Sequence, residues 1–144
     1  MTPQFVDTNI LLYAYDSSAG DKHERAAELV LRLARTGQGA LSVQVLQEFY
    51  VNAVFKIARP LTHEQALLRL RALSQWYVHS PLASDVLAAA ELRQRYQLSL
   101  WDAMIIQSAS RLGCQTLWTE DLNASQVISG VAIRNPLVAP FVAP

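Results

Sequence analysis

The sequence predicts a single α/β domain built on a parallel sheet. Short apolar runs alternate with longer stretches of helical periodicity along the chain, which is typical of strands joined by helical crossovers. The chain has 144 residues, of which 51% are hydrophobic. A domain of this size buries roughly two-thirds of the surface that its unfolded chain exposes, so we expect one hydrophobic core rather than two.

The expected strands are short apolar runs that end at a polar residue or a turn. A parallel sheet of four or five strands is predicted at residues Gln4–Val6, 40–42, Tyr77–His79 and 115–118, with 131–133 as the fifth candidate. The segment from residue 135 to the end holds three of the six prolines and is not compatible with a central strand. We therefore divide the chain into a domain of residues 1–137 and a Pro-rich tail of residues 138–144.

Helices are predicted between these strands from apolar periodicity and from residues that favour helix ends. Asp21 with Glu24, and Thr62 with Gln65, have the spacing of a capping box at a helix start. Pro60 ends one helix, and Gly113 suits the position after another. The expected helices span residues 9–15, Asp21–Thr36, 43–58, 62–75, 85–96 and 100–112.

Composition and charge exclude several classes of protein. The formal net charge is +0, which argues against a protein that holds nucleic acid by broad electrostatic attraction. The single cysteine, Cys114, excludes an internal disulfide framework and a zinc site built from cysteines. With neither a signal-peptide pattern at the N-terminus nor an apolar run of about 18 residues, we expect a cytoplasmic protein that does not span a membrane.

Acidic residues follow three of the predicted strands. Asp7 comes directly after the first strand, Glu48 lies in the helix after the second, and Asp121 lies three residues past the fourth. The carboxyl ends of parallel strands meet at one edge of a sheet, so these side chains should converge there. Asp102, near the start of a largely apolar helix, is the fourth candidate. Gathered carboxylates repel each other unless cations bind, and such pockets suit Mg²⁺ or Mn²⁺.

A second interpretation exists for each acidic residue. Asp7 is also a candidate helix N-cap, a role that aspartate favours, and Asp102 is also a candidate for a capping interaction with Ser99, three residues earlier. Capping is compatible with metal binding. Asp121 suits an ordinary turn. Glu120 is expected to be solvated rather than to ligate a metal. The tryptophans Trp76, Trp101 and Trp118 fit core or interface packing better than stacking on RNA bases.

Four short motifs carry a resemblance to a known family. They are Phe-Val-Asp7-Thr8-Asn9-Ile-Leu, Leu-Gln-Glu48-Phe, Trp-Asp102-Ala-Met-Ile and Thr119-Glu-Asp121-Leu. In order and spacing they resemble the PIN-domain nucleases, and most of all the short bacterial VapC-type toxins of type II toxin–antitoxin systems. Each motif is weakly specific alone, whereas their order over about residues 4–137 is specific. The resemblance implies a three-layer α/β/α fold around the parallel sheet.

The same resemblance implies an activity and a set of site residues. The activity is hydrolysis of RNA phosphodiester bonds by an endoribonuclease that depends on Mg²⁺ or Mn²⁺, held by Asp7, Asp102 and Asp121 directly or through water. Glu48 either ligates through water or orients the nucleophile. The implied catalytic residues are Asp7, Glu48, Asp102 and Asp121, with Asn9 and Thr119 in support.

Expectations about partners rest on the same resemblance and on the surface. Only 17% of residues are charged, below the roughly 25% that is typical, which indicates that part of the exterior is covered. Two apolar helices, at residues 26–34 and 43–55, offer more apolar area than one sheet face requires. We expect a homodimer and a small antitoxin that covers helical grooves and inserts a basic side chain into the acidic pocket. The RNA substrate should be single-stranded or a loop.

Two alternatives to this function stay open at the level of the sequence. A phosphatase of the haloacid-dehalogenase type also begins with an aspartate after its first strand, but it needs a second aspartate where this chain has Asn9. It also uses a lysine, and only Lys22 and Lys56 are present. The other alternative is a PIN-like interaction module without catalysis, which the presence of all four carboxylates disfavours.

Overall fold

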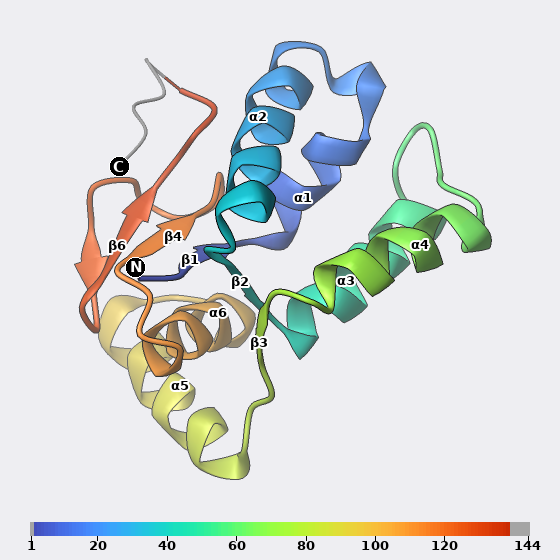
Figure 1. Ribbon diagram of the computed structural model, residues 1–144. Helices are drawn as coiled ribbons and strands as arrows, with labels where there is room; N and C mark the ends of the chain where they lie inside the picture. The colour runs from blue at the N-terminus through green and yellow to red at the C-terminus, as the bar shows by residue number, and fades with distance from the viewer. Residues whose placement is uncertain (1, 139–144) are drawn as a thin grey trace.

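The computed structural model describes residues 2–138, which form three layers around one six-stranded sheet (Figure 1). The order across the sheet is β3-β2-β1-β4-β6-β5, and every neighbouring pair is parallel except β5 with β6. The strands are β1 (Gln4–Val6), β2 (Gly39–Ser42), β3 (Tyr77–His79), β4 (Thr116–Trp118), β5 (Val127–Ile128) and β6 (Val131–Arg134). The predicted α/β class and the parallel core of the sheet are confirmed.

The sheet is larger than the four or five strands that the sequence predicts. The additional strand, β5, has only two residues and forms an antiparallel edge hairpin with β6. Ser129 and Gly130 close the hairpin, and both have positive φ, at 52° and 77°, as a tight two-residue hairpin turn requires. Two residues are too few to show the alternation by which a strand is recognised, which is why β5 was missed.

The helices follow the predicted order with shifts at their ends. Helix α3 ends three residues before the predicted residue 58, and α5 begins two residues before the predicted residue 85. The helices are α1 (Thr8–Tyr15), α2 (Asp21–Thr36), α3 (Val43–Phe55), α4 (His63–Leu73), α5 (Ala83–Tyr96) and α6 (Leu100–Arg111), with a short 3₁₀ turn at Ser17–Ala19.

Of the two predicted capping boxes, one is confirmed and one is wrong. Gln65 N donates to Thr62 Oγ1 at 3.1 Å, and Thr62 N donates to Gln65 Oε1 at 2.9 Å, which closes the box at the start of α4. At the start of α2 the N-cap is Gly20, which makes no side-chain cap, and Asp21 is the first helical residue. There the Asp21 carboxylate interacts with the positive end of the helix dipole instead.

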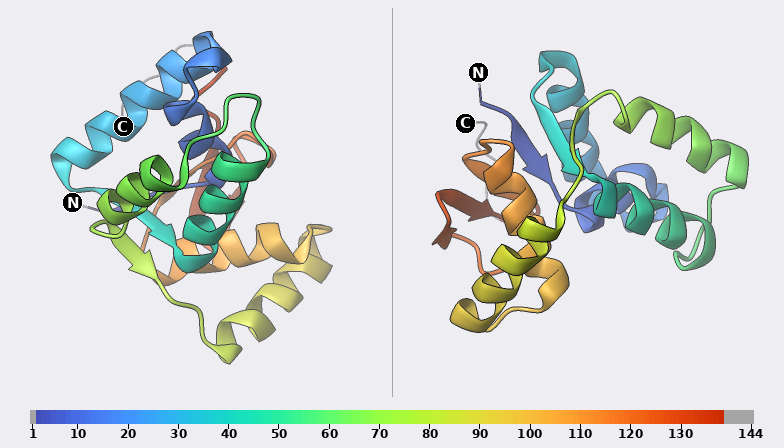
Figure 2. Two further views of the ribbon diagram at one scale, coloured as in Figure 1. Left: turned by 90° about the vertical axis from the view of Figure 1, so that its right-hand side faces the viewer. Right: turned by 90° about the horizontal axis from the view of Figure 1, so that it is seen from below.

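Helices cover both faces of the sheet. Helices α1 and α2 lie on one side of it and α5 and α6 on the other, while α3 and α4 pack together at one end (Figures 1 and 2). The core runs through all layers: Phe5 and Leu117 of the sheet, Leu29 of α2 and Ile106 of α6 belong to one buried cluster. Burial of these apolar side chains supplies the main stabilisation of the fold.

The central strands β1 and β4 set the position of the site. The chain continues from β1 to β2 on one side, whereas β4 and β6 lie on the other, so the strand order reverses between β1 and β4. Ligands of open α/β sheets bind outside the carboxyl ends of the strands at such a reversal. Within residues 2–138, no helix is long and apolar enough to cross a membrane. The predicted tail lies, apart from Val138, outside the described residues.

Candidate active site

Asp7 lies at the centre of this edge, between β1 and α1. Its side chain is only 5% exposed, and it caps α1 by accepting a hydrogen bond from Thr8 N at 2.7 Å. The other carboxylate oxygen accepts from Thr119 Oγ1 at 2.8 Å. Burial raises the pKa of Asp7 to about 6, opposed by these two hydrogen bonds and reinforced by the charges of Glu48 and Asp121. The capping interpretation of Asp7 is thus confirmed without excluding a metal ligand.

Glu48 reaches the same place from α3. Thr8 Oγ1 donates to Glu48 Oε1 at 2.8 Å, so one residue contacts both Asp7 and Glu48. The amide of Gln44, one turn earlier on α3, donates to Glu48 Oε2 at 3.3 Å. Thr8 and Gln44 were missed by the sequence analysis. A hydroxyl directly after Asp7 was a visible signal for Thr8, whereas nothing in the sequence marked Gln44.

Asp102 and Asp121 complete the set from α6 and from the loop after β4. Ser99 caps α6, with its hydroxyl accepting from Asp102 N at 3.1 Å. Burial raises the pKa of Asp102, and the charges of Asp121 and Glu48 act in the same direction. Asp121 is exposed, and its backbone N donates to Thr119 Oγ1 at 3.2 Å. All four predicted acidic residues therefore interact electrostatically within one site.

These carboxylates line one open hollow of about 250 Å³. Leu12 and Ile105 contribute apolar wall, and no lysine, arginine or histidine belongs to the lining. The residues that line the hollow are Asp7, Thr8, Asn9, Leu12, Gln44, Glu48, Asn52, Trp101, Asp102, Ile105 and Asp121. Carboxylates gathered in this way repel each other at neutral pH, and a cation from solution would relieve that repulsion.

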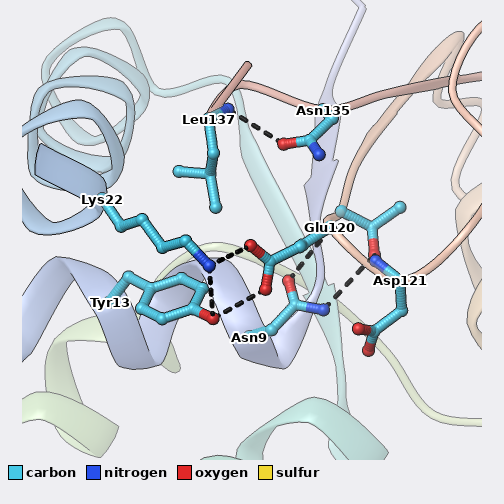
Figure 3. Close-up of polar contacts among 8 residues, drawn as sticks. Asn9, Tyr13, Lys22, Glu120, Asp121, Asn135 and Leu137 are labelled. Atoms are coloured by element: carbon cyan, nitrogen blue, oxygen red, sulfur yellow. Dashed lines mark hydrogen bonds and ion pairs between the residues drawn. The ribbon is translucent and has the colours of Figure 1, made fainter. Parts of the chain in front are cut away.

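The side chain of Glu120, the residue between Thr119 and Asp121, points toward Tyr13 and Lys22 and away from the side chain of Asp121 (Figure 3), and it does not line the hollow. Its carboxylate accepts from Tyr13 OH at 2.6 Å and pairs with Lys22 Nζ at 2.7 Å. Desolvation by burial is the largest single effect on Glu120 and raises its pKa. The hydrogen bonds from Lys22 and Tyr13, together with the charge of Lys22, outweigh it, so the pKa of Glu120 is lowered. The expectation of a solvated Glu120 is thus incomplete: the residue does not line the hollow, but it is paired with α1 and α2.

Asn9 and Thr119 contact the loop that carries Asp121. Asn9 Oδ1 accepts from Glu120 N at 3.3 Å, while its amide nitrogen lies 3.5 Å from Thr119 Oγ1 (Figure 3). Thr119 is fully buried, and its hydroxyl links Asp7 with Asp121 N. Both predicted supporting residues thus make contacts that position the acidic side chains.

The donor set fits a hard divalent cation. Carboxylate oxygens are the ligands that Mg²⁺ and Mn²⁺ prefer, and Mg²⁺ keeps several of its waters when it binds protein. Among residues 2–138, no three aspartate, glutamate, histidine or cysteine side chains lie together in a way that could hold a metal ion. A cation in the hollow would therefore need water between it and some of these carboxylates.

A comparison with protein families agrees with the fold and with this arrangement of acidic residues. The chain matches the PIN domain family over residues 5–128 and belongs to that family. This membership decides against the phosphatase alternative. No curated protein is similar enough in sequence to count as a match.

Solved structures with the same fold come from bacterial toxin–antitoxin systems. A toxin–antitoxin complex from Klebsiella pneumoniae has a TM-score of 0.69 at 24% identity, covering 92% of this chain and 97% of the other. VapBC2 from Rickettsia felis, bound to a promoter DNA fragment, has a TM-score of 0.63 at 24% identity, with 93% and 98% covered. VapC20 from Mycobacterium tuberculosis, a toxin that cleaves the sarcin–ricin loop, has a TM-score of 0.56 at 22% identity, with 78% and 85% covered.

Proposed function

We propose that this protein is a divalent-metal-dependent endoribonuclease that acts as the toxin of a toxin–antitoxin pair. One observation carries the catalytic part: four carboxylates from distant segments line one hollow with no basic residue in its lining. Family membership supports a nuclease, and the sarcin–ricin loop cleaved by VapC20 supports RNA as the substrate. A bound Mg²⁺ or Mn²⁺ supplies activation of water and stabilisation of the charge that develops on the phosphate.

The chain's own residues hold and orient the reacting groups. Asp7, Asp102 and Asp121 would hold the cation directly or through water, with Asp7 the most rigidly fixed because two donors fix its carboxylate. Glu48, whose carboxylate accepts hydrogen bonds from Thr8 and Gln44, would either ligate the cation through water or orient the attacking water. Thr119 connects Asp7 to the loop that carries Asp121, because its hydroxyl donates to Asp7 and accepts from Asp121 N.

A small antitoxin and a second copy of the chain are the proposed partners. Related folds are seen in toxin–antitoxin complexes, two of which are bound to DNA. Helices α2 and α3 include the two segments predicted to have more apolar area than one sheet face requires. On them, Leu31 is 51% exposed and Phe55 is 71% exposed. A groove of about 500 Å³ also lies over α3 and α4, lined by Leu46, Gln47, Tyr50, Val51, Leu70 and Ser74. A basic antitoxin side chain that enters the acidic hollow would inhibit the enzyme. A cytoplasmic location fits this role.

The central test replaces Asp7 by Asn. Asparagine caps helices as well as aspartate does and has nearly the same volume, so the fold should be retained while a charged ligand is lost. We expect purified wild-type protein to cleave total cellular RNA with Mg²⁺ or Mn²⁺ and to stop when EDTA is added. The Asp7→Asn variant should lose cleavage at every mapped site.

The matched control is Asp21→Asn, which removes the same charge from an aspartate that pairs with Arg25 on the surface of α2. It should cleave like the wild type. Equal cleavage by Asp7→Asn and wild-type protein would refute the role of Asp7, and no metal-dependent cleavage by wild-type protein would favour the non-catalytic interaction module.

A further inference from the structure

One tryptophan lies on the surface beside the acidic hollow. Trp118 is 2% exposed, and its indole N–H donates to Gln4 Oε1, so it belongs to the core. Trp76 packs over Gly39 and leaves no room there for a Cβ atom. Trp101, in contrast, is 64% exposed and lines the hollow. Core packing thus holds for Trp76 and Trp118 but not for Trp101, for which packing at an interface stays a prediction.

The backbone of Trp101 is fixed relative to the carboxylates. Trp101 is the second residue of α6 and directly precedes Asp102. Its carbonyl oxygen accepts from Gln44 Nε2 at 3.3 Å, and the same amide donates to Glu48 Oε2 at 3.3 Å. The backbone of Trp101 is therefore tied to the acidic wall formed by α3, and a ligand in the hollow would meet the residue in a defined position.

A single exposed apolar side chain is normal on a protein surface, so the position of the Trp101 side chain, and not its exposure alone, sets it apart. Among the described residues, ten other large apolar side chains are exposed, but none of them lines the hollow. They are Leu31, Val51, Phe55, Leu68, Tyr77, Leu82, Val86, Leu87, Val127 and Val138. Trp101 thus combines exposure with a place at the reacting centre.

Within the hollow, basic side chains do not supply affinity for RNA. No lysine, arginine or histidine belongs to its lining, and the chain carries a formal net charge of +0. Attraction of phosphates by basic side chains therefore does not hold the substrate at this position. A bound cation would contact the phosphate, and contacts with bases can add to that affinity, because every base has a flat face that stacks on an aromatic ring.

We propose that Trp101 forms a base-stacking subsite that binds an unpaired nucleobase of RNA next to the phosphate that is cut. This inference rests on the proposed ribonuclease function and adds the recognition element to it. Stacking on the indole requires a base free of its neighbours, so the subsite selects single strands, loops and bulges over duplex RNA. Because all bases stack, it provides affinity and position with little sequence preference.

The test combines changes in the protein with changes in the RNA. A short single-stranded RNA with one mapped cleavage site is prepared in versions that lack one base at a time around that site. With wild-type protein, we expect one abasic position to reduce kcat/KM roughly 5- to 100-fold, mainly by raising KM. Trp101→Ala should show a similar loss on intact RNA and little further loss at that abasic position. Trp101→Phe should keep most of the activity.

The controls separate stacking from other roles of Trp101. Phe55→Ala removes an exposed aromatic ring that does not line the hollow, and it should leave the abasic profile unchanged. The melting temperature and Mn²⁺ affinity of Trp101→Ala should equal those of wild-type protein, because the indole is exposed and ligates nothing. If each abasic position reduces kcat/KM by the same factor in Trp101→Ala as in wild-type protein, the subsite does not exist.

Two further outcomes are decisive. If Trp101→Ala cleaves all RNAs as the wild type does but loses antitoxin binding, the indole serves the protein partner and the inference is overturned while the ribonuclease stands. If wild-type protein cleaves no RNA under any metal condition, the proposed function fails and the subsite fails with it.

Discussion

Two buried aspartates of this protein have opposite surroundings. Asp7 is 5% exposed and Asp85, at the start of α5, is 2% exposed. Asp85 accepts hydrogen bonds from Leu82 N and Gln107 Nε2, both at 2.9 Å, and pairs with Arg111 Nε at 3.4 Å and His79 Nε2 at 3.5 Å. These donors, with the backbone N–H of Leu82 first, lower the pKa of Asp85. Asp7 has two neutral donors, and its burial, reinforced by the charges of Glu48 and Asp121, raises its pKa.

The comparison shows how a structural carboxylate differs from a functional one. The donors around Asp85 satisfy its charge within the protein, so the Asp85 cluster (Asp85, His79, Gln107, Arg111 and Leu82 N) joins β3, α5 and α6 and needs no ligand. The charge of Asp7 is left for a cation from solution to balance. Groups whose pKa is perturbed by burial and like charges in a cleft are typical of functional sites.

The largest expected effect concerns activity. Asp7→Asn should reduce RNA cleavage about 1000-fold or more, because it removes a charged ligand from the reacting centre. Asp85→Asn, which lies outside the hollow, should change kcat/KM by less than about threefold at a temperature where both variants are folded. Initial rates on one RNA measure both. A similar loss in the two variants would erase the distinction between the aspartates.

The second prediction concerns stability, in which Asp85→Asn should lose more than Asp7→Asn, the reverse of their order in activity. Asp85→Asn leaves Arg111 and His79 without their carboxylate, so its melting temperature should fall by several degrees. In EDTA at pH 8, Asp7→Asn should be more stable than wild-type protein by up to about 3 kcal/mol, because the pKa of Asp7 lies about two units above its usual value. Urea unfolding measures both differences. Destabilisation by Asp7→Asn would contradict the unbalanced charge.

The third prediction is the pH dependence behind that difference. The raised pKa means that folded protein binds the Asp7 proton more tightly than the unfolded chain does. In EDTA this contribution is complete below the usual pKa of 3.8 and is lost as the pH rises through about 6. The lowered pKa values of Asp85 and His79 act oppositely, so their contributions are lost as the pH falls. The free energy of unfolding of wild-type protein minus that of Asp7→Asn, measured in EDTA, should decline between pH 4 and 6.

The fourth prediction concerns metal linkage. Mn²⁺ at about 100 times its Kd should stabilise wild-type protein by about 2.7 kcal/mol, because it binds only the folded state. Asp85→Asn should gain the same increment over its own metal-free stability, whereas Asp7→Asn should gain much less. Thermal melts with and without Mn²⁺ test this, and equal gains in all three proteins would place the cation elsewhere.

The smallest expected effect is at the Glu120 contacts. Lys22→Glu and Glu120→Lys each place like charges together and should weaken Mn²⁺ binding a few-fold by loosening the Asp121 loop. The double variant restores an opposite-charge pair and should recover part of that affinity. Calorimetric titration with Mn²⁺ measures the cycle. Additive losses in the double variant would show that the Lys22–Glu120 pair does not position Asp121.

Sequence periodicity alone predicted most of the elements but not their ends. Thr62 with Gln65 was read correctly because a capping box is a local structure of four residues. Asp21 with Glu24 has the same spacing, yet the φ of 63° at Gly20 starts α2 differently. The hairpin of Val127–Ile128 with Val131–Arg134 depends on pairing at the edge of a finished sheet, which no local pattern of two residues reveals.

The sequence by itself determined the α/β class, the parallel strands and the four carboxylates, because periodicity and residue type are local properties. Only the tertiary structure decided which side chains share a space: Thr8 between Asp7 and Glu48, Gln44 between Glu48 and Trp101, and Glu120 bound to Lys22 on the far side of its loop. Residues so distant in sequence meet through the crossing of helices and strands, and it is this geometry that leaves the charge of Asp7 unbalanced while that of Asp85 is neutralised.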